Sequence, residues 1–97
     1  VRESLIREIV NIIAHEIVLK DTNRPESVHF LNSEIIEYRS QAEKTAKEFN
    51  WNNEDKKYLE NKSLEMIKEK LSEKYSDVNY SAEELIRKLK ELIKDII

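Results

Sequence analysis

Apolar residues recur every three or four positions in four separate segments of the chain. In the first segment, from about Arg2 to Lys20, the apolar row has steps of four, three and four. This spacing predicts an α-helix, and the segment is too long for an ordinary strand. The row consists of Ile6, Val10, Ile13 and Ile17, with Leu5, Ile9, Ile12 and Leu19 beside it. Because Arg7, Asn11 and His15 form only one narrow polar line, we expect this helix to be mostly buried.

The second segment carries the most regular apolar row of the chain. Asn23 with Glu26 three residues later resembles a capping box, and Pro25 is tolerated in a first helical turn. From there the row alternates steps of three and four without a slip, as in helices that pack at a shallow angle. Its members are Val28, Leu31, Ile35, Tyr38, Ala42, Thr45 and Phe49.

A third helix is predicted from about Glu54 to Tyr75. The residues before it, Asn50 to Asn53, include types that cap helices and that tolerate a left-handed backbone, so we expect a tight corner there. The apolar row consists of Leu64, Ile67, Leu71 and Tyr75, with Leu59 and Met66 beside it. The rest of the helix surface is almost wholly Lys and Glu, which predicts a solvated face.

The fourth helix is predicted to begin at Ser81, because Ser81 and Glu84 match the Ser-x-x-Glu capping box. On its polar side, Glu83 with Arg87 and Glu84 with Lys88 have the spacing of i,i+4 ion pairs. Its apolar row is Leu85, Leu89, Leu92 and Ile96, widened by Ile86, Ile93 and Ile97.

These elements predict an all-α fold, a small bundle of three to four helices that is partly antiparallel with heptad-like packing. The 97 residues leave room for one core, so residues 1–97 are expected to form a single helical domain. The chain begins at Val1 without a methionine, which leaves open that the domain is excised from a larger protein.

The composition excludes several classes of function. Without glycine, Gly-rich phosphate loops and nucleophile elbows are nearly ruled out, and without cysteine there is no thiolate nucleophile or Cys-based zinc site. No arrangement of Ser, His, Asp or Lys indicates a nucleophile with an oriented base. We therefore expect no enzyme activity, no catalytic residue, no metal and no cofactor. No segment is apolar enough to span a membrane, so we expect a soluble protein. The lack of cysteine fits any redox compartment, so the localisation stays open, with the cytoplasm as our expectation.

The apolar helix faces are the strongest candidates for function. The first helix is apolar nearly all round and the last ends in an unbroken stripe, which is more than one small bundle is expected to cover. We therefore predict a non-enzymatic protein–protein interaction or assembly domain, whose partner is another protein or a second copy of the chain. The predicted interface residues are Ile9, Ile13, Ile17, Leu89, Ile93, Ile96 and Ile97.

An alternative function is accessory nucleic-acid binding through the lysine-rich helix over residues 56–74. The candidate residues are Lys56, Lys57, Lys68, Lys70 and Lys74. Lysines and tyrosines supply phosphate contacts and stacking surfaces. However, acidic residues are interspersed on the same helix and the chain has a net charge of −3, so a protein partner is favoured.

A third alternative is a carboxylate metal site. Glu26 and His29 have the Glu-x-x-His spacing that puts a carboxylate and an imidazole on one helical face. One copy is half of a di-metal site, so a two-fold dimer would have to complete it.

Overall fold

The computed structural model describes the backbone of residues 2–21, 25–76 and 78–97, and the side chains of residues 2–20, 28–76 and 78–97. It contains four helices, α1 (Arg2–Asp21), α2 (Pro25–Lys47), α3 (Asn53–Lys74) and α4 (Ala82–Ile96). No strand occurs in these residues, so the all-α prediction is confirmed.

Side-chain caps set the starts of α3 and α4. Asn52 accepts a hydrogen bond from the backbone N–H of Asp55 (2.8 Å), and the Asp55 carboxylate accepts one from the Asn52 backbone N–H (3.4 Å). Ser81 Oγ accepts from the backbone N–H of Glu84 (3.1 Å), as predicted. The described backbone contains no residue with a positive φ, so the corner before α3 needs no left-handed asparagine. The predicted cap at Asn23 lies outside the described residues.

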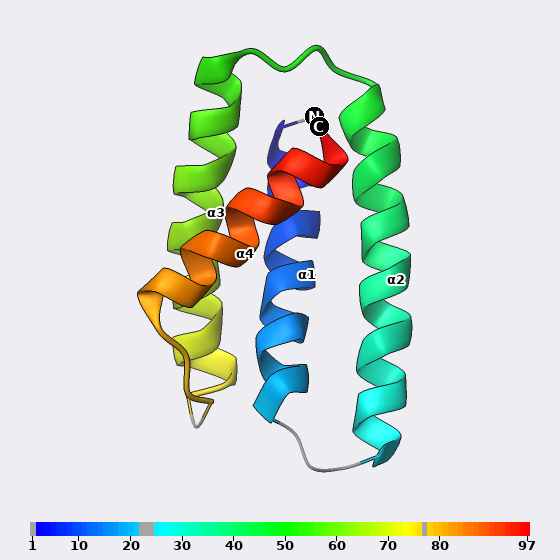
Figure 1. Cartoon of the computed structure of the whole chain (residues 1–97), viewed down its shortest axis with the longest axis vertical. Helices are drawn as coiled ribbons and strands as arrows, with labels where there is room; N and C mark the ends of the chain where they lie inside the picture. The colour runs from blue at the N-terminus through cyan, green and yellow to red at the C-terminus, as the bar shows by residue number, and fades with distance from the viewer. Residues whose placement is uncertain (1, 22–24, 77) are drawn as a thin grey trace.

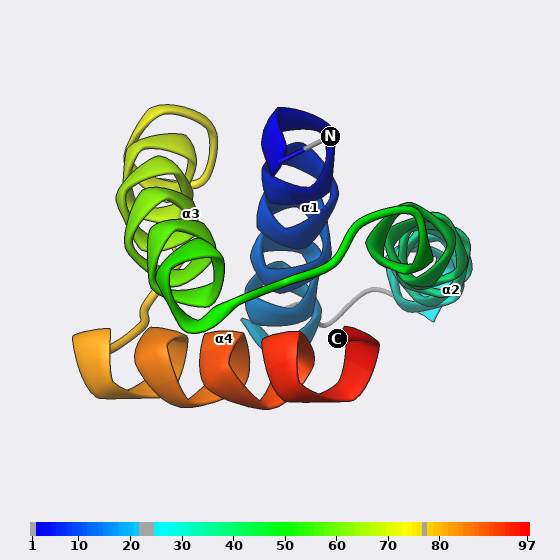
Figure 2. The same ribbon diagram turned by 90° about the horizontal axis from the view of Figure 1, so that it is seen from above.

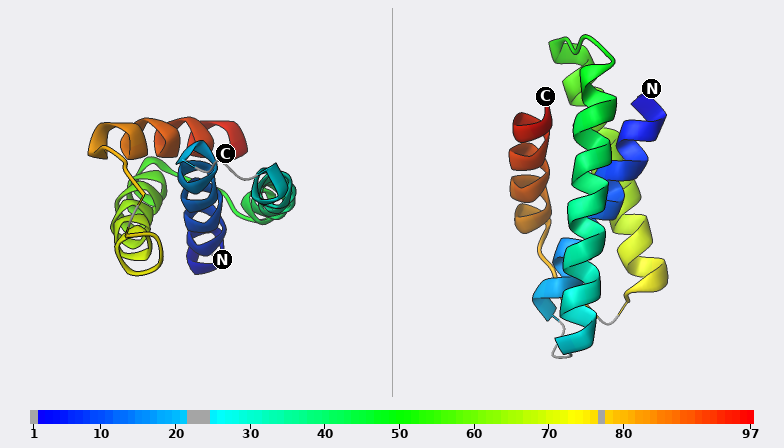
Figure 3. Two further views of the ribbon diagram at one scale, coloured as in Figure 1. Left: turned by 90° about the horizontal axis from the view of Figure 1, so that it is seen from below. Right: turned by 90° about the vertical axis from the view of Figure 1, so that its right-hand side faces the viewer.

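Three helices form a layer, and the fourth crosses one side of it. Within the layer α1 lies between α3 and α2, and α4 runs obliquely over α3 and α1 until its C-terminal end approaches α2 (Figures 1 and 2). The two views of Figure 3 place α4 on one side of this layer, with no described helix on the other.

The helices are partly antiparallel, as predicted. α1 and α2 are antiparallel neighbours, as their apolar rows and short connection predict (Figure 1). α3 does not pack against α2, because the chain after α2 crosses the end of α1 and α3 then runs parallel to α1 on its far side (Figures 1 and 2). α3 follows α2 in the sequence, but its neighbour in the layer is α1.

The central place of α1 corrects the expectation that its apolar surface exceeds what the chain can cover. α1 packs against α2, α3 and α4, so it is surrounded on three sides. The buried side chains include six of the seven predicted interface residues, namely Ile9, Ile13, Ile17, Leu89, Ile93 and Ile96. Within this chain those six form core and not an exposed docking surface; only Ile97 is exposed, at 37%.

Two apolar rows differ in detail from the predicted ones. The α2 row holds from Leu31 to Thr45, but Phe49 follows the end of the helix and is exposed. In α3 the buried row runs at steps of four through Leu59, Ser63, Ile67 and Leu71, while Leu64, Met66 and Tyr75 are half-buried. Ser63 is fully buried and its hydroxyl has no hydrogen-bond partner among the described residues.

Charged side chains tie α4 to all three helices of the layer. Four of the five ion pairs formed by the described residues join α4 to another helix: Lys20–Glu84 (2.9 Å), Glu16–Lys88 (3.7 Å), Arg39–Asp95 (3.5 Å) and Glu60–Lys90 (3.9 Å). Neither predicted pair within α4 forms: Glu84 and Lys88 pair with Lys20 and Glu16 of α1 instead, and Glu83 and Arg87 form no ion pair among the described residues.

Candidate docking wedge between α3 and α4

A cavity is lined by the N-terminal part of α3 and the C-terminal part of α4, which crosses the layer obliquely. Its volume is about 460 Å³. α3 contributes the first residue of the helix and three charged side chains, and α4 with its C-cap residue contributes two lysines and two isoleucines. The lining residues are Asn53, Lys56, Lys57, Glu60, Lys90, Ile93, Lys94 and Ile97. We refer to this cavity as the wedge.

The wedge is strongly basic although the chain is acidic. Four lysines and one glutamate give the lining a formal charge of +3, whereas the whole chain carries −3. The N-terminal end of the α3 dipole adds further positive potential on the α3 side. A local field of this sign attracts carboxylates and phosphates.

Most of this positive charge is not neutralised within the chain. Among the described residues, Lys56, Lys57 and Lys94 form no ion pair within 4.0 Å. Asp55 and Asp95 neighbour these lysines in the sequence, but they pair with Arg2 (3.6 Å) and Arg39 (3.5 Å). The lysines therefore remain available to an anionic group from outside.

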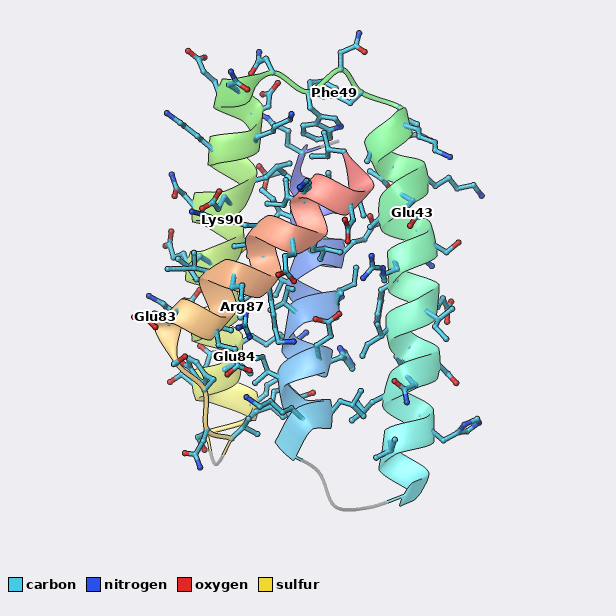
Figure 4. All side chains as sticks on the ribbon, viewed as in Figure 1. Glu43, Phe49, Glu83, Glu84, Arg87 and Lys90 are labelled. Carbon is cyan, nitrogen blue, oxygen red and sulfur yellow. The ribbon has the colours of Figure 1, made fainter. Side chains whose placement is uncertain are left out.

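The α4 wall of the wedge also supplies apolar surface. Ile97, the residue just after the end of α4, is 37% exposed, whereas Ile93, four residues earlier, is 7% exposed and belongs mainly to the core. Phe49 lies at the same end of the molecule, in the connection between α2 and α3 (Figure 4), and is 38% exposed. Its ring packs against Trp51, with ring centres 4.7 Å apart. An occupant of the wedge would thus meet both positive charge and apolar side chains.

The structure brings together residues from both predicted lists. Ile93 and Ile97 were predicted as protein interface, and Lys56 and Lys57 as a nucleic-acid face; all four line the wedge. Lys90 was not among the predicted residues. Its spacing of four residues from Lys94, which places both lysines on one face of α4, is the sequence signal that could have indicated it. No sequence pattern indicates that this turn lies against the start of α3.

The remaining predicted lysines lie elsewhere. Lys70 and Lys74 line a separate groove of about 300 Å³ against α1, and Lys68 is exposed and lines neither cavity. The Lys70 ammonium group donates a hydrogen bond to Asn11 Oδ1 on α1. Burial, and then the nearby charge of Lys74, lower the pKa of Lys70 below its usual value. The five candidates of α3 therefore do not form one continuous basic face.

Among the residues whose side chains are described, the histidines do not lie in a cluster of metal ligands. No group of three or more His, Asp or Glu side chains among the described residues is arranged to hold a metal ion. His29 is exposed on α2, and the side chain of Glu26 lies outside the described residues. His15 is half-buried, with Nδ1 2.6 Å from the backbone oxygen of Asn11 and its ring 5.6 Å from that of Tyr38.

Comparison with other proteins identifies no relative. The sequence matches no family model, and no curated protein or solved structure gives a match. None of the described helices combines the length and the apolar character needed to cross a membrane.

Proposed function

We propose that the chain is a protein-interaction domain that docks an acidic amphipathic helix of another protein in the wedge. The observation that carries this proposal is the combination, in one cavity, of three lysines without an ion-pair partner among the described residues and the exposed side chain of Ile97. Helix-in-groove recognition uses an apolar row as its anchor and flanking charges for orientation. The expected partner is therefore a helix with a row of apolar residues and with carboxylates on both sides of that row.

The placement of the lysines supports two rows of charge contacts. Lys56 and Lys57 stand on the α3 wall, and Lys90 and Lys94 stand on the α4 wall. A helix lying between these walls would meet positive charge on both flanks and the exposed side chain of Ile97 along its apolar face. Complementary charges of this kind mainly set orientation and association rate, while buried apolar side chains slow dissociation.

A nucleic acid fits this arrangement less well than a protein. Sequence-independent binding needs a run of phosphate contacts along an extended basic surface. Here the basic residues of α3 are divided between the wedge and the groove of Lys70, and the net charge of −3 repels a polyanion at longer range.

The proposal can be tested with a designed peptide of about 16 residues, which spans roughly four helical turns. The probe has Leu at helical i, i+3, i+4 and i+7 spacing and Glu at the other positions, with a fluorescent label. Binding to the full chain is measured by fluorescence anisotropy. The matched probe replaces every Glu with Lys, and a single-stranded DNA oligonucleotide serves as the polyanion probe.

The decisive comparison uses two pairs of charge reversals. Lys57→Glu with Lys94→Glu changes both walls of the wedge, and we expect binding of the acidic peptide to weaken at least about tenfold. Lys44→Glu with Lys68→Glu changes two exposed lysines outside the wedge and should leave the affinity within about twofold. Equal losses in both pairs, or no binding at all, would refute the proposal. Tighter binding of the oligonucleotide, lost in the first pair alone, would establish the nucleic-acid alternative instead.

A further inference from the structure

One acidic side chain stands inside the wedge. Glu60 is the single carboxylate among its lining residues, and its side chain is largely covered. It comes from α3 and approaches Lys90 of α4, which lies on the side of α4 that faces α3 (Figure 4). The ion pair therefore bridges the two walls between which the partner helix is proposed to lie.

The contact between these two groups is weak. Lys90 Nζ and Glu60 Oε1 are 3.9 Å apart, which is too long for a hydrogen bond. The Lys90 side chain is 63% exposed, so water screens the attraction. Exposed pairs of this kind contribute little to stability and exchange readily with other charges.

We propose that Glu60 is an internal competitor for the wedge: its carboxylate occupies Lys90 in the free protein, and a carboxylate of the partner helix displaces it. This inference rests on the proposed function and adds how the site selects its partner. A ligand gains a net contact at Lys90 only when it brings a negative charge of its own. Apolar helices without acidic residues leave the Glu60–Lys90 pair in place and gain no charge contact.

The energetic consequence has a definite sign. Bringing a second carboxylate to Lys90 costs both the loss of the existing ion pair and repulsion from Glu60. Neutralising Glu60 removes both costs, so the acidic peptide should bind more tightly. Because the groups are partly solvated, the gain should be modest, about two- to fivefold, and should shrink as salt screens the charges.

The test measures the dissociation constant of the acidic Leu/Glu peptide for the full chain carrying Glu60→Gln. Gln keeps the size of the side chain and has a similar helix propensity, so α3 should be unaffected. The matched control is Glu65→Gln, which removes an exposed carboxylate of the same helix outside the wedge. We expect tighter binding only for Glu60→Gln, with the difference falling as NaCl is raised.

A double-mutant cycle separates competition for Lys90 from general repulsion. In a Lys90→Gln background the Glu60→Gln gain should fall to less than half, because the contested cation is gone. An undiminished gain in that background, or equal effects of Glu60→Gln and Glu65→Gln, would overturn the inference while leaving docking in the wedge intact. Loss of sensitivity to Lys57→Glu with Lys94→Glu would instead remove the proposed function, and this inference with it.

Discussion

Thr45 Oγ1 on α2 donates a hydrogen bond to Glu8 Oε1 on α1, at 3.3 Å, while Glu8 Oε2 is buried with no partner among the described residues. Burial raises the pKa of Glu8 above its usual value of 4.5; the Thr45 hydrogen bond lowers it and the nearby charge of Glu48 raises it. The folded chain therefore prefers this carboxyl in its protonated form more than the unfolded chain does.

Replacing Glu8 should stabilise the protein at neutral pH. The pKa of Glu8 is higher in the folded state than in the unfolded state, so between these two pKa values the folded state holds more protons. The free energy of unfolding therefore falls as pH rises from about 4.5 through the raised pKa. Glu8→Gln removes this loss, and we expect the free energy of unfolding at pH 7 to increase by about 1 kcal/mol. Urea unfolding at pH 4 and pH 7 measures it, and the gain should be larger at pH 7. Glu43→Gln, on the outer surface of α2 (Figure 4), is the control and should show no such pH-dependent gain.

The core position of α1 predicts unequal costs for two isoleucines. Ile13 is fully buried, whereas Ile36 on α2 is 69% exposed. Ile13→Ala should destabilise the chain by about 2 to 5 kcal/mol, because it removes buried methylene groups and leaves a cavity. Ile36→Ala should change stability by less than about 0.5 kcal/mol. Comparable losses in urea unfolding would mean that α1 is not the central helix.

Local patterns predicted the helices well, because caps and apolar spacing act over a few residues. Asn52 and Ser81 cap the starts of α3 and α4 as their residue types indicate, and the α2 row packs as its spacing predicts from Leu31 to Thr45. The order of helices in the layer could not be predicted in this way. A helix that is apolar nearly all round, such as α1, has the same pattern whether its own chain or a partner covers it.

The wedge was beyond local prediction for the same reason. Lys57 lies near the start of α3 and Lys94 near the end of α4, so they are far apart in the sequence. Only tertiary packing brings them to the same cavity. Glu84 illustrates the limit for charges: its spacing favours Lys88 on the same helix, but α1 places Lys20 2.9 Å away. Sequence spacing identifies which charges are available and not which of them meet.

The buried hydroxyl of Ser63 predicts a stabilising substitution. Ser63 lies in the buried row of α3, where its Oγ has lost water without gaining a partner among the described residues. Ser63→Ala removes that unmatched group and should raise the free energy of unfolding by about 1 kcal/mol. Ser72→Ala on the exposed side of the same helix reports the helix-propensity gain alone, which is about 0.5 kcal/mol. A Ser63→Ala gain no larger than that of Ser72→Ala would show that the hydroxyl is satisfied in solution.

The groove between α1 and α3 predicts an unusual lysine titration. Burial and the charge of Lys74 lower the pKa of Lys70, so stability should rise with pH in the window just below the usual value of 10.5. Lys74→Gln removes a like charge and should raise the pKa of Lys70. Asn11→Leu removes the acceptor that favours the ammonium form and should lower it further. An NMR titration of the lysine side chains measures these shifts, and shifts of the same sign in both variants would contradict the assigned causes.

The ion pair between Lys20 and Glu84 predicts how firmly the start of α4 is held. The hydrogen bond from Lys20 is the main cause that lowers the pKa of Glu84, so its contribution is present above about pH 4.5 and is lost as pH falls through the lowered value. Lys20→Gln should cost less than about 1 kcal/mol in low salt and almost nothing in high salt. Exchanging the two charges, Lys20→Glu with Glu84→Lys, should recover only part of the loss, because a cation in the first turn of α4 opposes the helix dipole. Urea unfolding at two NaCl concentrations measures these changes in stability. Lys47→Gln is the control, because Lys47 forms no ion pair among the described residues. Full recovery of stability in the charge-exchanged variant would mean that the dipole of α4 does not affect this ion pair.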